Sequence, residues 1–77
     1  MPELLSLDQL IPGQSAIIQF FTDQAMSLKF LEMGCLPGER ISLQRVAPLG
    51  DPIAISVSGY LLSMRKEEAA TIMVSRI

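Results

Sequence analysis

The chain has 77 residues, enough for one domain, with a net charge of −2, six basic residues and no histidine. A domain of this length buries only about 60% of the surface that its unfolded chain exposes. Because 49% of its residues are nevertheless hydrophobic, we expect some apolar side chains to be exposed. Exposed apolar side chains of this kind mark an interface. The scattered basic residues argue against a nucleic-acid binder, and the charge-free runs 9–22 and 52–64 are too short for a membrane-spanning helix.

The N-terminal residues and the cysteine content indicate a cellular compartment. Glu3 stands where a secretory signal would have basic residues, so we expect no signal peptide. The single cysteine, Cys35, cannot form an intrachain disulfide and suits a reducing environment. We therefore expect a cytoplasmic protein that does not insert into a membrane.

The first segment predicts a helical turn followed by a strand. Ser6 and Gln9 have the spacing of a capping box, and Pro12-Gly13 would end a single turn that begins there. Residues 14–21 are rich in Ile and Phe but do not alternate cleanly between apolar and polar. This pattern predicts a strand that is contacted on both faces or contains a bulge.

A short α-helix is predicted over residues 24–33. Thr22 or Asp23 can cap its first turn, and Gly34 suits the left-handed residue that ends a helix. One face carries the apolar residues Met26, Phe30 and Met33. We expect this stripe to face the core.

Residues 39–46 predict the next strand. Their alternation places Ile41, Leu43 and Arg45 on one face and the polar residues between them on the other. We therefore expect Arg45 on the same side of the strand as the two core residues.

The remainder of the chain predicts more short strands. Residues 53–57 alternate as a half-buried strand does, residues 60–64 predict a further strand, and 66–70 form one helical turn before a last strand at 72–77. Five or six short strands with one short α-helix and frequent turns indicate a small, mainly β protein that closes as a barrel.

Residues 47–52, between the predicted strands 39–46 and 53–57, form a loop rich in proline and glycine. Pro48 suits the second position of a type I turn and Gly50 can adopt a positive φ. Pro52 restricts Asp51 to an extended conformation, where its carboxylate can accept hydrogen bonds from loop amides. We assign Pro48, Gly50 and Pro52 to a structural role. The backbone conformation of this turn does not require leucine at position 49.

Motifs along nearly the whole chain resemble the FeoA family, the small partners of the bacterial ferrous-iron transporter FeoB. They are Leu31-x-x-Gly34, Leu36-Pro37-Gly38, Ala47-Pro48-x-Gly50-Asp51-Pro52 and Arg65-x-Glu67-x-Ala69. The resemblance implies one SH3-like domain over residues 1–77. It also implies a non-enzymatic accessory protein that contacts FeoB, at the GTP-binding cytoplasmic region.

Two other functions remain open. The protein could modulate or activate the transporter's GTPase, with Arg45 or Arg65 as an arginine finger. The commoner role for such arginines is to hold carboxylates or carbonyls within the barrel. It could instead be a metal-dependent, self-associating regulatory domain like the C-terminal domain of iron-dependent repressors. Weak self-association is compatible with either function.

Metal and cofactor chemistry have little support in this sequence. Without histidine, the lone Cys35 cannot build a tetrahedral zinc or iron–sulfur site, and no serine has an activating base. The remaining ligand candidates are surface acids, Glu32, Glu39, Asp51, Glu67 and Glu68. We expect no tight metal site and no cofactor.

The sequence suggests six residues for partner contact. Leu28 on the helix would be a hydrophobic contact beside Leu49, and Tyr60 follows Gly59 at a strand junction where an aromatic ring can be exposed. The complete candidate set is Leu28, Arg45, Leu49, Asp51, Tyr60 and Arg65.

Overall fold

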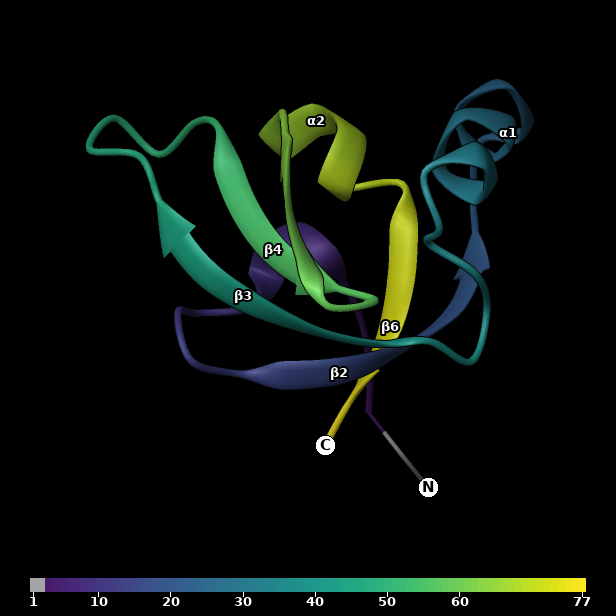
Figure 1. Cartoon of the computed structure of the whole chain (residues 1–77), viewed down its shortest axis with the longest axis horizontal. Helices are drawn as coiled ribbons and strands as arrows, with labels where there is room; N and C mark the ends of the chain where they lie inside the picture. Colours follow the sequence, from purple (N-terminus) through teal and green to yellow (C-terminus); the bar gives the residue numbers. More distant parts are fainter. Residues whose placement is uncertain (1–2) are drawn as a thin grey trace.

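The fold is one antiparallel sheet of six strands that curls into a small barrel (Figure 1). It is described by a computed structural model over residues 3–77. The strands are β1 (Leu4–Ser6), β2 (Ser15–Phe21), β3 (Arg40–Val46), β4 (Ile53–Val57), β5 (Tyr60–Met64) and β6 (Ile72–Arg76). Their order in the sheet is β1-β6-β2-β3-β4-β5. The predicted mainly β barrel of five or six strands is confirmed.

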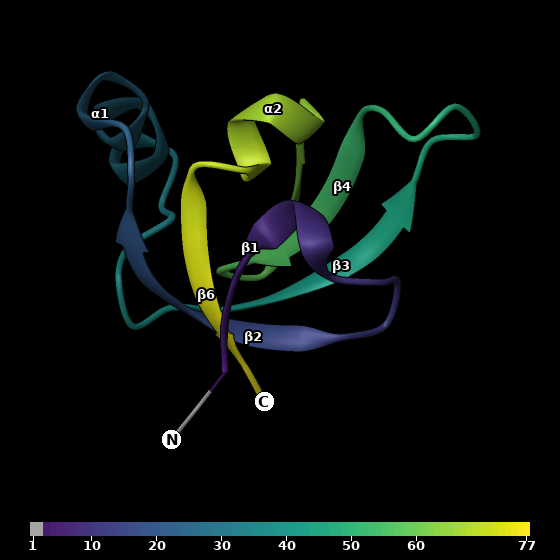
Figure 2. The same ribbon diagram turned by 180° about the vertical axis from the view of Figure 1, so that it is seen from behind.

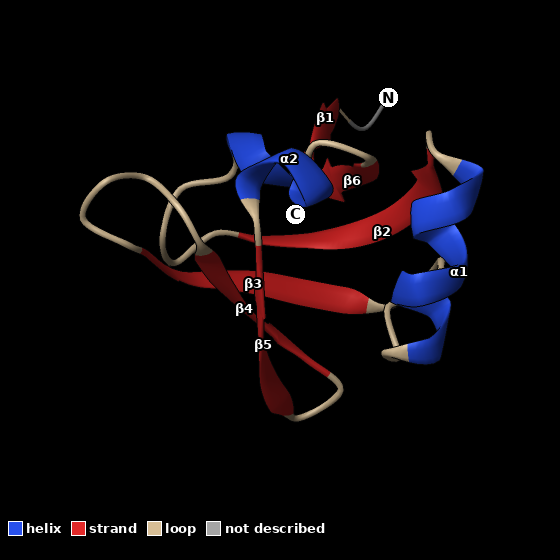
Figure 3. Ribbon diagram, turned by 90° about the horizontal axis from the view of Figure 1, so that it is seen from above, coloured by secondary structure: helices blue, strands red, loops and turns tan. Residues whose placement is uncertain are grey.

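Three short helical segments complete the fold: η1 (Leu7–Gln9), α1 (Gln24–Glu32) and α2 (Lys66–Ala69). Seen from above, α1 flanks the barrel on one side and α2 lies near its middle (Figure 3). Within residues 3–77, no helix has the length and apolar character needed to cross a bilayer.

The core lies between the curled faces of the sheet and is lined by alternate strand residues. In β4, Ile53, Ile55 and Val57 are buried while Ala54 and Ser56 are only partly so. The period of two in the sequence therefore sets which face of β4 packs inward.

Helix α1 forms as its sequence predicts. The Asp23 carboxylate accepts hydrogen bonds from the Ala25 and Met26 amides at 2.9 and 3.2 Å, which caps the first turn. Phe30 is fully buried and Met26 packs against the core. Gly34 ends the helix with a φ of +90°. Phe30 and Met26 of the apolar stripe therefore face the core as expected, whereas Met33, at the end of the helix, is only partly buried and is not among the residues packed against the core.

Register shifts explain two departures from simple alternation. In β2 the pairing with β6 shifts between Ile18 and Phe20, which confirms the predicted bulge. In β3 the pairing with β4 shifts between Leu43 and Arg45. Ile41 and Leu43 face the core but Arg45 is exposed, so the prediction that these three residues share a face is wrong, because the bulge reverses the alternation after Leu43.

The N-terminal segment contains a strand that the sequence did not predict. β1 pairs with β6, and the Ser6 amide donates to Gln9 Oε1 at 2.9 Å at the start of η1. The helical turn at η1 is as expected, and it buries Leu7. Three residues are too few to show the alternation of apolar and polar side chains that indicates a strand. β1 is therefore identified only by its pairing with β6 in the structure.

Glu68 joins the two α-helices. Its carboxylate accepts a hydrogen bond from Lys29 Nζ of α1 at 2.5 Å and one from the Arg65 amide at 2.8 Å, at the start of α2. These two hydrogen bonds, that of Lys29 first, hold the pKa of Glu68 below its ordinary value. The ionised carboxylate therefore stabilises this arrangement of α1 and α2.

The Glu68→Gln variant tests this link. The amide can still accept from Arg65 but carries no charge toward Lys29, so we expect it to lower the free energy of unfolding by at most about 1 kcal/mol at neutral pH. Because the folded-state pKa is lowered, this contribution is present above the ordinary value of 4.5 and is lost as the pH falls through the folded-state pKa. Urea denaturation at several pH values measures it.

Glu67→Gln is the matched control, since Glu67 is exposed and makes no side-chain hydrogen bond or ion pair within residues 3–77. If the free energies of unfolding of the wild type and Glu68→Gln differ by the same amount in acid as at neutral pH, the ion pair contributes nothing to stability.

Candidate partner-binding surface

The β3–β4 loop, residues 47–52, is closed by its own backbone. The Gly50 amide donates to the Ala47 carbonyl at 2.7 Å, and the Ala47 amide donates to the Pro52 carbonyl at 3.0 Å. Gly50 has a φ of +91°, which favours glycine. The expected turn at Pro48 is present.

Asp51 has a different partner from the one predicted. Its carboxylate accepts a hydrogen bond from the Lys66 amide at 2.9 Å, at the start of α2, whereas a bond from the amides of its own loop was expected. The loop is thereby attached to a segment 15 positions further along the chain. Asp51 therefore has a structural role that local sequence does not reveal.

Leu49 lies at the tip of this loop and is 97% exposed. Burying a leucine is favourable by about 1.5–3 kcal/mol, and none of this is gained within the domain. Leu49 therefore offers apolar surface to a partner at no cost to the core.

A shallow apolar groove of about 450 Å³ lies beside the loop, between its two stems and β5. The main side chains that line it are Arg45, Val46, Pro48, Pro52, Leu61 and Leu62. Leu61 is 61% exposed and Val46 is 36% exposed. These two residues were missed by the sequence analysis, although Leu61 lies at an outward position of a strand that faces solvent on one side.

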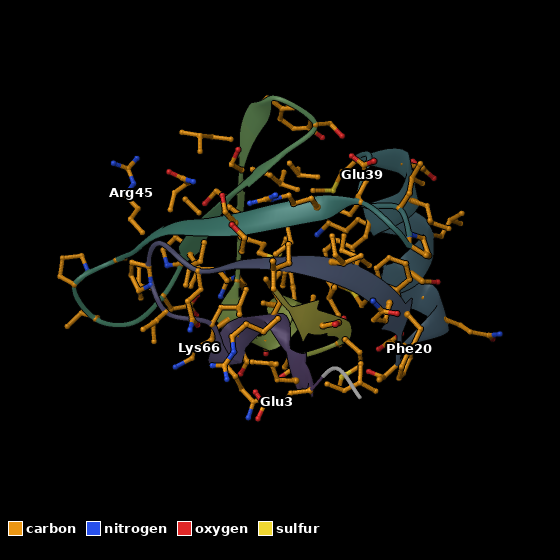
Figure 4. The ribbon with its side chains drawn as sticks, turned by 90° about the horizontal axis from the view of Figure 1, so that it is seen from below. Glu3, Phe20, Glu39, Arg45 and Lys66 are labelled. Atoms are coloured by element: carbon orange, nitrogen blue, oxygen red, sulfur yellow. The ribbon has the colours of Figure 1, made fainter. Side chains whose placement is uncertain are left out.

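Two arginine side chains lie in or near this groove. Arg45 extends from the end of β3 (Figure 4), and Arg65 lies beside Asp51 and Pro52 at the start of α2. Within residues 3–77, neither guanidinium lies within 4.0 Å of a carboxylate oxygen or makes a hydrogen bond. The expectation that both arginines hold carboxylates or carbonyls within the barrel is therefore wrong.

Leu28 belongs to a different surface. It is 62% exposed on α1, and α1 and the β3–β4 loop lie at opposite ends of the molecule with α2 between them (Figures 1 and 2). The prediction that Leu28 lies beside Leu49 is wrong, since the barrel separates them. Leu28 cannot join the contact surface around the loop.

Tyr60 is 44% exposed, as expected, but its hydroxyl has a partner within the domain. It donates a hydrogen bond to the Met33 carbonyl at the end of α1. A Cβ atom at Gly34 would lie 3.2 Å from the tyrosine oxygen. The pair Gly34 and Tyr60 thus joins the end of α1 to β5.

The groups that could perform metal or nucleophilic chemistry are dispersed. No cluster of three or more Cys, Asp or Glu side chains suited to a metal ion occurs in the part of the chain that the structure describes. Cys35 is fully buried. Burial first, and the charge of Glu39 second, raise the pKa of its thiol, so the thiol stays protonated at neutral pH.

Comparison with known proteins gives this surface a context. Residues 5–76 match the FeoA domain. The chain belongs to the FeoA family. Its resemblance to that family, first drawn from the motifs alone, is confirmed.

Three proteins illustrate the relationship. A fusion protein of Fe(2+) transport protein A and the Fe(2+) transporter FeoB from Porphyromonas gingivalis is 35% identical over 95% of this chain, which spans only 9% of the fusion protein. The FeoA-like protein from Clostridium acetobutylicum superposes with a TM-score of 0.92, at 31% identity, over 100% of this chain and 91% of that one. FeoA from Stenotrophomonas maltophilia, described as an SH3 domain protein, superposes with a TM-score of 0.81 at 24% identity, over 92% and 89%. The SH3-like fold is confirmed.

Two substitutions within the β3–β4 loop distinguish a residue that stabilises the fold from one that only forms surface. Asp51→Ala leaves the Lys66 amide without its acceptor, so we expect it to lower the free energy of unfolding by about 1 kcal/mol. Leu49→Ala removes only exposed atoms and should change it by less than about 0.5 kcal/mol. Chemical denaturation of both variants measures the difference. A Leu49→Ala variant that is as destabilised as Asp51→Ala would mean that Leu49 packs in the native protein.

Proposed function

We propose that this FeoA protein is a non-catalytic, cytoplasmic accessory protein of ferrous iron uptake that acts by binding the transporter FeoB. The observation that carries the proposal is the relative from Porphyromonas gingivalis, in which the two proteins form one polypeptide. Covalent linkage supplies a high effective concentration. Where FeoA and FeoB are separate chains, a contact surface has to supply the association instead.

The surface around the β3–β4 loop is the best candidate for this contact. It combines the exposed Leu49 with an apolar groove and two arginines that have no carboxylate partner within residues 3–77. Apolar contacts surrounded by charge are typical of transient interfaces. The proposed partner surface on FeoB is therefore apolar and flanked by acidic residues, and we assign it to the cytoplasmic GTP-binding region.

The same inventory of side chains supports the proposed non-catalytic role. The chain has no histidine, and its one thiol is buried and protonated. Residues 3–77 therefore offer neither a histidine base nor an exposed thiolate, the usual parts of an activated nucleophile.

The proposed contact is tested by titrating isotope-labelled protein with the cytoplasmic domain of FeoB. We expect resonances of residues 45–52 to shift. Leu49→Ala should weaken binding about tenfold or more, since a buried leucine contributes about 1.5–3 kcal/mol. Calorimetry gives the affinities.

Leu28→Ala is the matched control, because it removes an equally apolar, exposed side chain at the opposite end of the molecule. Shifts confined to α1, or equal losses from both substitutions, would reject the assignment of the β3–β4 loop. No shift anywhere would reject FeoB binding by this domain.

A second function, modulation of the transporter's GTPase, is favoured by the free guanidinium groups of Arg45 and Arg65. An arginine finger accelerates GTP hydrolysis by about 10³–10⁵-fold. If one of them acts so, its substitution by alanine or lysine abolishes the stimulation of GTP turnover by FeoB, because lysine lacks the planar fork.

Arg40→Ala is the control for this measurement, since Arg40 is exposed at the other end of β3. Stimulation that survives both Arg45→Ala and Arg65→Ala, or no stimulation by the wild-type protein, would reject the finger.

A further inference from the structure

The two ends of helix α2 are held in different ways. At its C-terminal end Ala69 is fully buried. At its N-terminal end, the exposed residues Arg65 and Lys66 have their amides bound by the side chains of Glu68 and Asp51, at 2.8 and 2.9 Å. The C-terminal end is therefore fixed by the core, whereas the N-terminal end depends on two carboxylates.

The dependence on these carboxylates makes the first turn of α2 a two-state element. A helix of four residues is not stable by itself, and exposed segments of a protein open locally without global unfolding. In the closed state, the turn aligns the Lys66 amide with Asp51 and the Glu68 carboxylate with the Arg65 amide. Opening of the turn breaks both hydrogen bonds together. A contact that stabilises one of them therefore also stabilises the other.

Lys29 of α1 stabilises the closed state from the side of α1. Its Nζ donates to Glu68 Oε2 at 2.5 Å, while Glu68 Oε1 accepts from the Arg65 amide. Lys29 is the only basic residue of α1, and α1 itself is anchored in the core by Phe30. A charge on a fixed element thus orients the Glu68 carboxylate for its bond to the first turn of α2.

The other charged side chains between the two helices do not duplicate this link. The cleft there is lined by Asp23, Met26, Arg65, Glu67, Glu68 and Thr71. Asp23 is bound to the first amides of α1, and within residues 3–77 it forms no ion pair with Arg65. Lys29 is therefore the cation that joins α1 to α2 in this part of the chain.

Asp51 attaches the β3–β4 loop to the same turn of α2. The loop keeps its own shape through the hydrogen bond from Gly50 to Ala47, so the bond from Lys66 to Asp51 fixes the position of the loop relative to α2. In Figure 1 this loop and α1 lie at opposite ends of the molecule, with α2 between them. The exposed Leu49 at the loop tip is thus held through a bond to the two-state turn.

We propose that α2 couples α1 to the β3–β4 loop: Lys29 is a positioning residue that keeps the first turn of α2 closed, and the closed turn holds the loop through Asp51. Coupling between distant sites requires an element with two states that both sites bias, and the first turn of α2 is that element. A contact that orders α1 or the loop then favours the ordered state of the other. This coupling goes beyond the proposed function and does not depend on FeoB binding.

The test is amide hydrogen exchange, measured by NMR on the free chain. The Ala70 amide donates to the Lys66 carbonyl at 3.0 Å and reports on the turn of α2, and the Gly50 amide reports on the loop. Lys29→Met removes the cation, so we expect both amides to exchange about two- to fivefold faster, which corresponds to the contribution of an exposed ion pair. Amides of the sheet interior, which exchange by global unfolding, give the change in global stability separately.

Matched variants separate coupling from independent local effects. Glu32→Gln removes an exposed charge of α1 that has no ion-pair partner within residues 3–77, so the exchange of the Gly50 amide should stay as in the wild type. Asp51→Ala detaches the loop from α2. In that background Lys29→Met should have no further effect on the Gly50 amide, because the two substitutions break the same link.

Three results would overturn the coupling. They are unchanged exchange of the Gly50 amide in Lys29→Met, an equal effect of Glu32→Gln, and an effect of Lys29→Met on this amide that persists undiminished in the Asp51→Ala background. FeoB is absent from these measurements, so they succeed or fail separately from the proposed function.

Discussion

The short helix α2 holds the periphery of the barrel together. Four residues cannot form a stable helix alone, because the first turn fixes several dihedrals for one hydrogen bond. Here Asp51 accepts from the Lys66 amide, while Glu68 accepts from the Arg65 amide and from Lys29. Two carboxylates thus connect α2 to the β3–β4 loop on one side and to α1 on the other. These bonds add to the burial of Phe30, which anchors α1, and to the backbone bonds that close the loop.

Features set by neighbouring residues could be predicted from the sequence. The alternation in β4, the Asp23 cap and the positive φ of Gly50 each follow from a few adjacent positions. The partner of Asp51 and the orientation of Arg45 could not be predicted. The first depends on a segment 15 residues away, and the second on a bulge that changes strand pairing without changing composition.

Only part of the candidate site could be predicted, because the sequence does not show which distant segments meet. Arg45 lines the groove beside the loop that carries Leu49, whereas Leu28 lies on another surface, because only the curled sheet determines which loops meet. The exposed hydrophobic residues are spread from the N-terminal segment to the C-terminal end of the chain, with members on β2, α1, the β3–β4 loop and β5, and are not gathered in one patch. A domain with so small a core can thereby present separate contact faces, one of which is the proposed FeoB contact.

The burial of Cys35 has a practical consequence for work on this protein. It is the only thiol in the chain, it is fully enclosed, and its raised pKa keeps it in the unreactive protonated form. A cysteine introduced at an exposed position such as 49 would therefore be the sole site that maleimide dyes modify in the folded protein. Fluorescent or spin labels can thus be placed at single positions while the native core remains unaltered.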